Sequence, residues 1–232
     1  MLENIRPEVL IYIPVMLFSL TVHEFAHALA AKLGGDHTAT YQGRLTLNPI
    51  VHMDPIGTVL MPLLAIFQSG FPMLFWAKPV PVNLLRLRHS IWHVYVALAG
   101  PASNLLLAAL AVTVLKLIMM VGGLPLAIQM QGPSDASGSS MAEAIFLVFQ
   151  MFIHVNIWLA IFNMIPLPPL DGSTLVYYFF IRGNHKAEMA WLNFSQYGFI
   201  ALFLMIQIRP VQDLLARANS IPFEFVMNWV KL

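Results

Sequence analysis

An almost uninterrupted apolar run, Val9 to Ala31, carries the sequence His-Glu-Phe-Ala-His at positions 23–27. As a helix this run is roughly 35 Å long, which is enough to cross the hydrocarbon core of a membrane. His23 and His27 fall one turn apart on one face of that helix. Two imidazoles at this spacing can hold one zinc ion, with Glu24 beside it as a base. Ionisable groups are costly in hydrocarbon, so three of them within five residues predict a functional site.

The alternative interpretation is a pair of buried histidines with satisfied hydrogen bonds, which membrane helices rarely carry. Composition supports a membrane setting, because 59% of the residues are hydrophobic and only 10% are charged, against about 25% charged in a soluble domain. The net charge of +1 gives no indication of a nucleic-acid partner. The chain has no cysteine, which excludes disulfides and thiolate metal ligands. We expect one membrane-embedded domain, with a transmembrane core at 1–210 and an amphipathic interfacial tail at 211–232.

Three further segments are apolar and long enough to span, namely Ile91–Val121, 142–165 and Ala187–Ile208. Ile56–Phe67 is apolar but too short to cross, and Ser173–Ile181 is typical of a short helix. We therefore predict an all-α polytopic membrane protein with about four full transmembrane helices plus a re-entrant segment.

The segment Thr38–Leu47 has β-branched and aromatic residues on both sides of Gln42-Gly43. This pattern predicts a small β-hairpin at the membrane face, and the alternative is an irregular loop. An edge strand there could hold an unwound peptide by β-addition, with Thr38 and Thr40 as contacts.

A catalytic zinc site needs a third protein ligand beside the two histidines. The best candidate is Asp171, which follows a proline-rich break at the end of the 142–165 span. Irregular backbone at membrane depth is tolerated where it lines a polar cavity. The alternative is a loop carboxylate at the membrane surface.

Topology tests this choice, because Asp171 shares a membrane face with the two histidines only if an even number of complete crossings separates them. The spans at 91–121 and 142–165 give two crossings. A third crossing at 56–67 would place Asp171 on the opposite face, so the metal hypothesis requires that segment to be re-entrant.

Basic residues indicate the orientation of the chain. The loop at 122–139 contains no Lys or Arg, whereas the other face, which carries the predicted metal site, is basic. Its residues are Lys78, Arg86, Arg88, Arg182 and Lys186. By the positive-inside rule the metal side is cytoplasmic, in what we expect to be a prokaryotic cell membrane.

Together these motifs resemble the site-2 protease family of intramembrane zinc metalloproteases. The resemblance covers the motif at 23–27, the stretch Gly-Pro-Ala-Ser-Asn at 100–104, and the stretch from Asn163 to Gly172, which matches the family's Asn-x-x-Pro-x-x-Pro-Leu-Asp-Gly. It implies that His23, His27 and Asp171 are zinc ligands and that Glu24 is the catalytic base.

The resemblance also implies that Asn163 lies near the substrate, where its amide could hydrogen-bond the scissile carbonyl. The alternative for Asn163 is an interhelical hydrogen bond. Asn104 is a candidate substrate contact, although helix packing is its simpler role. Trp76 belongs to a proline-rich segment, Trp76–Asn83, which we expect beside the cavity as a guide for the substrate.

The chain differs from larger family members in lacking a PDZ domain, a CBS pair, and a helix before the metal-motif helix. We expect a zinc endopeptidase, with one zinc per chain, that cleaves single-span membrane proteins within the lipid bilayer. The alternatives are a membrane metal transporter and a catalytically inactive homologue that binds membrane substrates.

Overall fold

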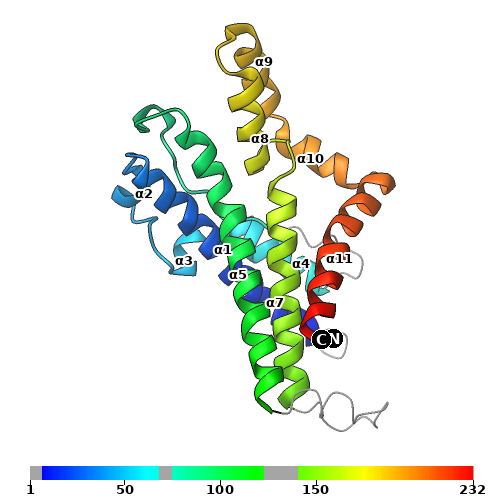
Figure 1. Ribbon diagram of the computed structural model, residues 1–232. Coiled ribbons are helices and arrows are strands. Elements are labelled where there is room, and N and C mark those ends of the chain that lie inside the picture. Colours follow the sequence, from blue (N-terminus) through cyan, green and yellow to red (C-terminus); the bar gives the residue numbers. More distant parts are fainter. Residues whose placement is uncertain (1–6, 68–74, 123–140, 232) are drawn as a thin grey trace.

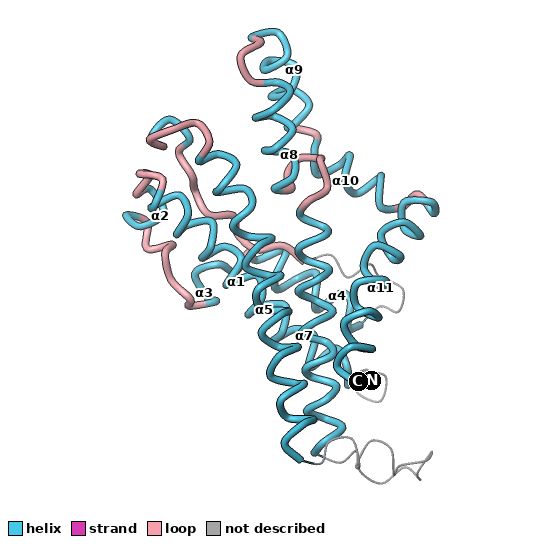
Figure 2. The backbone as a smooth tube through the Cα atoms, in the orientation of Figure 1, coloured by secondary structure: helices cyan, strands magenta, loops and turns pink. Residues whose placement is uncertain are grey.

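The computed structural model describes residues 7–67, 75–122 and 141–231, and every regular element within these ranges is helical (Figures 1 and 2). Three helices are long and apolar enough to cross a membrane: α1 (Pro7–Leu33), α5 (Trp92–Gly122) and α7 (Met141–Asn163). Figure 1 shows α5 and α7 side by side, with α1 crossing them, and all three helices are in mutual contact. These helices confirm the first three predicted spans.

The fourth predicted span, 187–208, is not one straight helix. It consists of α9 (His185–Ser195) and α10 (Gly198–Ile206), which are bent by 63° relative to each other. Gly198 lies at the bend, where an added Cβ would come 2.5 Å from the carbonyl oxygen of Pro168. The two backbones approach closely at this bend. The described residues therefore contain three helices long and apolar enough to span a membrane, or four if the bent pair counts as one.

The predicted β-hairpin at 38–47 is wrong, because the described residues contain no strand. Residues Thr38–Tyr41 form a short helix, α2, and Pro49–His52 form another, α3. Asp36 accepts hydrogen bonds from the backbone N–H and the hydroxyl of Thr38, which starts the helical turn. These local hydrogen bonds between Asp36 and Thr38 compete with strand pairing and outweigh the β-propensity of the threonines and the tyrosine.

The short apolar segment forms a π-helical turn, η2 (Pro55–Leu60), followed by α4 (Met61–Phe67). The chain before this segment and the chain after it meet again, since Lys78 donates its backbone N–H to the carbonyl of His52 at 2.8 Å. A chain that leaves and returns on one side of the bundle is what the re-entrant prediction requires. Residues 68–74, which connect α4 to the proline-rich segment Trp76–Asn83, lie outside the described ranges.

The remaining elements complete the metal side and the tail. They are η3 (Leu84–Arg86), α8 (Asp171–Val176), η4 (Tyr177–Ile181) and α11 (Arg209–Lys231). The predicted tail forms α11, which packs against α5 and α7 and buries Met227 and Val230 beside Leu115 and Ile153. An interfacial position for this helix stays a prediction.

Candidate metal centre

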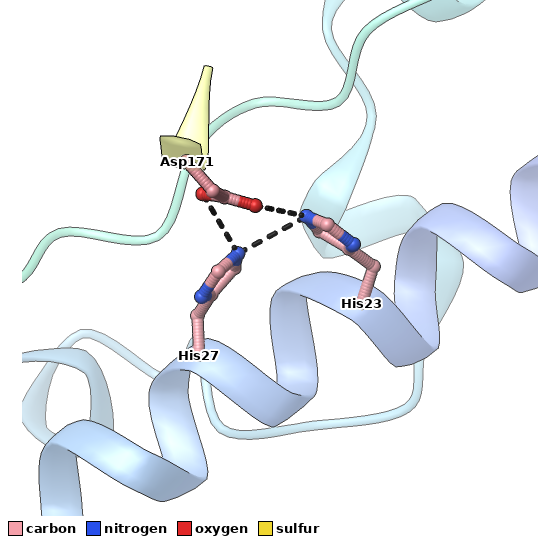
Figure 3. A group of neighbouring side chains, drawn as sticks. All are labelled: His23, His27 and Asp171. Atoms are coloured by element: carbon pink, nitrogen blue, oxygen red, sulfur yellow. Dashed lines mark hydrogen bonds and ion pairs between the residues drawn. The ribbon is translucent and has the colours of Figure 1, made fainter. Parts of the chain in front are cut away.

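Three side chains from two distant parts of the chain meet beside α1 (Figure 3). His23 and His27 project from one face of α1, and both are buried. The Asp171 carboxylate faces them, with Oδ2 at 3.2 Å from Nε2 of His23 and Oδ1 at 3.3 Å from Nε2 of His27. The structure thus brings together the three residues that the sequence predicts as ligands.

Asp171 is delivered by the turn that follows α7. Pro166, Pro168 and Pro169 prevent the helix from continuing, and the chain folds back over the end of α7. Gly172 makes this fold possible, because an added Cβ there would lie 2.6 Å from the carbonyl oxygen of Ile165. The glycine of the Asp-Gly pair therefore serves to place the carboxylate.

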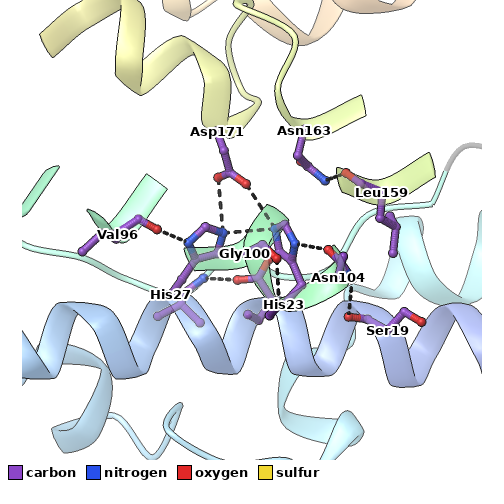
Figure 4. A network of polar contacts seen from close by, with 12 residues as sticks. Ser19, His23, His27, Val96, Gly100, Asn104, Leu159, Asn163 and Asp171 are labelled. Carbon is purple, nitrogen blue, oxygen red and sulfur yellow. Dashed lines mark hydrogen bonds and ion pairs between the residues drawn. The ribbon is translucent and has the colours of Figure 1, made fainter. Parts of the chain in front are cut away.

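The hydrogen bonds of the two histidines fix which ring nitrogen carries the proton. Nδ1 of His27 lies 2.7 Å from the carbonyl oxygen of Val96, and Nδ1 of His23 lies 2.7 Å from Oδ1 of Asn104 (Figure 4). Both partner oxygens can only accept, so both Nδ1 atoms donate. Each Nε2 is then left with a lone pair, and the two Nε2 atoms face each other at 3.0 Å.

This arrangement fits a bound cation. Two lone pairs and a carboxylate converge within 4.8 Å, and Oδ2 of Asp171 is buried without a hydrogen-bond donor among the described residues. Three acceptors without a donor repel one another unless a positive ion lies between them. Two imidazoles and one carboxylate are a ligand set typical of catalytic zinc, and the set leaves a position open.

Gly100 of α5 forms one wall of this centre (Figure 4). An added Cβ would lie 2.6 Å from Nε2 of His23 and closer still to Nε2 of His27. Position 100 therefore has room for hydrogen only, and no side chain of α5 can enter at this point.

A cavity of about 480 Å³ opens onto the centre. Its lining includes Glu24, Asn163 and apolar side chains such as Leu159 and Phe162. Asn163 donates one N–H of its amide to the carbonyl of Leu159 at 2.9 Å, which leaves the second N–H of the same group available.

The cavity is also lined by an extended segment, residues 75–83, which we call the strap. Val80 of the strap donates its backbone N–H to Oε2 of Glu24 at 2.8 Å. This hydrogen bond ties Oε2 of Glu24 to the strap, and Oε1 accepts no hydrogen bond from the described residues.

Two buried charged residues hold the strap in place. The guanidinium of Arg44 donates to the carbonyls of Val51, Lys78 and Pro79. Asp36 accepts the backbone N–H of Asn83 at 2.6 Å in addition to its bonds from Thr38. Burial by itself raises the pKa of Asp36, but these hydrogen bonds and the charge of Arg86 outweigh it and lower the pKa below its usual value.

The residues predicted as substrate contacts divide into two groups. Trp76 lines the cavity, where it packs edge-on against Phe199. Asn104 is fully buried beside His23, away from the cavity, and the Thr38 hydroxyl is bonded to Asp36. Thr40 does not line the cavity either, and its hydroxyl is buried. For these three residues the structure provides no contact with the space a substrate would enter.

Sequence reasoning missed Arg44, Val80 and His93. His93 lines the cavity, and it precedes Gly100 by seven residues, or two turns of α5. That spacing from the Gly-Pro motif could have identified it. The roles of Val80 and Arg44 depend on folded backbone geometry, which no residue pattern signals.

The comparisons with known proteins agree with this geometry. A model of Peptidase family M50 matches residues 11–206. The chain is 38% identical over 197 residues to "Putative zinc metalloprotease YwhC" of Bacillus subtilis (strain 168), a match that covers 84% of this chain and 79% of that protein. No solved structure gives a significant match.

Two similar mycobacterial proteins are both named "Putative zinc metalloprotease Rip2". The one from Mycolicibacterium smegmatis is 28% identical over 193 residues, which cover 82% of this chain and 64% of that protein. The one from Mycobacterium tuberculosis (strain ATCC 25618 / H37Rv) is 29% identical over 156 residues, which cover 67% of this chain and 52% of that protein. Zinc is thus named in each of the three relatives.

Proposed function

Because this chain belongs to peptidase family M50, the site-2 protease family, we propose that it hydrolyses peptide bonds in the transmembrane segments of single-span membrane proteins. The observation that carries the proposal is the convergence of His23, His27 and Asp171 beside Glu24. The two histidines and Glu24 lie on α1, which is long enough to span the bilayer. Such a site would act in regulated intramembrane proteolysis.

His23, His27 and Asp171 would hold the metal. Zinc, when bound, lowers the pKa of a coordinated water and polarises the peptide carbonyl. Glu24 would accept the proton of the attacking water through Oε1 and later give it to the leaving amine. The bond from Val80 to Oε2 would hold the carboxylate in the orientation that this transfer needs.

Asn163 would assist the substrate carbonyl. It lines the same cavity as Glu24 and the Asp171 carboxylate, and one amide N–H is not used by the bond to Leu159. That N–H would donate to the carbonyl oxygen as negative charge develops on it, which is the role of an oxyanion-hole donor.

The strap would guide the substrate. A transmembrane helix hides its carbonyls in its own hydrogen bonds, so it must unwind before hydrolysis. Trp76 and Val82 line the cavity from the strap side, and Pro79 and Pro81 stiffen the segment between them.

The basic residues of the metal side would orient the cavity toward the cytoplasm, and the similar proteins are all bacterial.

The test combines cleavage with transport. Purified wild-type protein is incubated in detergent with a panel of single-span substrates, first as isolated, then with a chelator, and then with zinc restored. The same protein in liposomes is assayed for zinc uptake. Cleavage that the chelator abolishes and zinc restores supports the proposal. Zinc uptake without cleavage, or neither activity, would overturn it in favour of a transporter or an inactive homologue.

A further inference from the structure

A chain of buried polar side chains runs from α7 through α5 to the metal centre, and Figure 4 shows its members Ser19, Asn104 and His23. Ser19, Asn104 and Asn156 are fully buried and come from α1, α5 and α7. The amide nitrogen of Asn156 donates to Oγ of Ser19 at 2.9 Å. The amide nitrogen of Asn104 donates to Oδ1 of Asn156 at 2.9 Å and, at the longer distance of 3.4 Å, to the backbone carbonyl of Ser19. Oδ1 of Asn104 in turn faces Nδ1 of His23.

The direction of each hydrogen bond follows from one fixed end. The amide nitrogen of Asn156 also donates to the backbone carbonyl of Phe152 at 2.9 Å, and a carbonyl can only accept. This bond fixes which side of the Asn156 amide carries oxygen, so its Oδ1 must accept from Asn104. Asn104 therefore presents its own oxygen to His23.

We propose that Asn156 is a positioning residue for the metal centre. By orienting the amide of Asn104 it keeps the proton of His23 on Nδ1 and the lone pair on Nε2, which faces Asp171 and His27. The inference rests on the proposed zinc site. It adds a residue that is connected to the ligand His23 through two hydrogen bonds, by way of Asn104. Ser19 completes the arrangement as an acceptor for Asn156.

The two histidines differ in how securely this state is held. The partner of His27 is the backbone carbonyl of Val96, whose acceptor character no side-chain change can alter. The partner of His23 is an amide, which becomes a donor if it rotates by 180° about its terminal bond. A donor facing Nδ1 of His23 would move the proton to Nε2 and remove the lone pair that binds metal. Only His23 therefore needs a residue that prevents the rotation.

Asn156→Leu tests this role, because it removes the closer of the two acceptors that orient Asn104 and leaves only the backbone carbonyl of Ser19 at 3.4 Å. The zinc dissociation constant is measured by competition with a chelator, and the visible spectrum of the cobalt-substituted protein reports the coordination of the centre. Outer partners of ligating histidines typically change metal affinity about 10–100-fold. We expect a loss of that size, with an altered cobalt spectrum. Wild-type affinity would overturn the inference.

Adding Asn104→Asp to Asn156→Leu separates orientation from packing. A carboxylate has two acceptor oxygens, so it cannot present a donor to His23 whichever way it turns. We expect the double variant to recover most of the lost zinc affinity. If Asn156 serves only helix packing, a buried carboxylate would worsen the single variant, and no recovery would contradict the inference.

Asn219→Leu is the matched control, and Asn156→Asp is the variant to use if Asn156→Leu does not fold. Asn219 is buried on α11 and donates to Nε2 of His154 at 2.7 Å, so its loss should lower the unfolding temperature without changing zinc affinity.

Asn156→Asp keeps an acceptor toward Asn104, so zinc affinity should stay within a few-fold of wild type, and a larger loss overturns the inference. Zinc binding without proteolysis in the wild type would refute the proposed function alone.

Discussion

Val80 and Glu24 are 56 positions apart, yet the backbone N–H of Val80 donates to Oε2 of Glu24 at 2.8 Å. The proline-rich strap is thereby coupled to the side chain that we propose as the base. Arg44 donates to the carbonyls of Lys78 and Pro79, and Asp36 accepts the backbone N–H of Asn83. The orientation of the Glu24 carboxylate therefore depends on residues well outside the metal motif.

Val80→Pro tests this coupling, because proline has no backbone N–H. A hydrogen bond to a charged group contributes roughly 1.5–3 kcal/mol, so we expect kcat to fall by about 10–100-fold while zinc content stays unchanged. Val82→Pro is the control for the chemical step, since the N–H of Val82 donates to no group in the described part of the chain. Because Val82 lines the cavity, its substitution can change KM, and the two variants are compared by kcat alone. Equal effects of the two substitutions on kcat would contradict the role given to the bond.

Gly100→Ala should remove the metal. Glycine to alanine within a helix normally stabilises by about 0.8–1 kcal/mol, so a purely helical effect would raise the unfolding temperature. Here the new methyl group would overlap both imidazoles. We expect zinc to bind at least tenfold more weakly, by chelator competition, and the metal-free protein to unfold at a lower temperature, because overpacking costs about 1–3 kcal/mol and outweighs the helical gain. Unchanged zinc affinity would show that the imidazoles can move aside.

Asp36→Asn should destabilise the protein in a pH-dependent way. The pKa of Asp36 in the folded protein lies below its unfolded value of about 3.9, so its ionised form stabilises the fold above about pH 4. This contribution is lost as the pH falls through the folded-state pKa. We therefore expect the variant to unfold a few degrees below wild type at pH 7, with the difference shrinking below about pH 4. Asp213→Asn, at an exposed position on α11, is the control.

The strap, rather than the 38–47 segment, should contact the substrate. The chain has no cysteine, so single cysteines can be introduced without background. A cross-linker at Val82→Cys, which lines the cavity, should capture a substrate near its scissile bond, whereas Thr38→Cys should not. Capture at position 38 alone would show that the substrate enters elsewhere. The readout is mass spectrometry of the cross-linked peptides.

Much of the site could be predicted from residue pattern and topology. The one-turn spacing of His23 and His27 fixes their common face, and counting crossings placed Asp171 on their side of the membrane. That count required a re-entrant segment, and the bond between Lys78 and His52 shows the chain returning to its starting point. Long apolar helices are signalled strongly because their length and hydropathy are properties of the sequence alone.

The parts that could not be predicted depend on long-range contacts of polar groups. The threonines of α2 follow Asp36, whose hydrogen bonds with Thr38 favour a helical turn over a hairpin. Asn104 occurs in a recognisable motif, but only the packing of α1 against α5 shows that its partner is His23 rather than a substrate. The bend before Gly198 depends on a backbone approach to Pro168 that no hydropathy pattern reports.

The most direct test of the account is the cleavage rate of Glu24→Gln at matched zinc content. Glutamine keeps the size and polarity of the side chain but cannot accept the proton of the attacking water. Wild type and variant are first shown to hold the same zinc per chain, and cleavage of a single-span substrate is then followed under identical conditions. General-base catalysis is typically worth about 10²–10⁴-fold, so we expect the variant to lose at least that much of its rate. Cleavage near the wild-type rate by a zinc-loaded Glu24→Gln protein would contradict the assignment of this site as the place of hydrolysis.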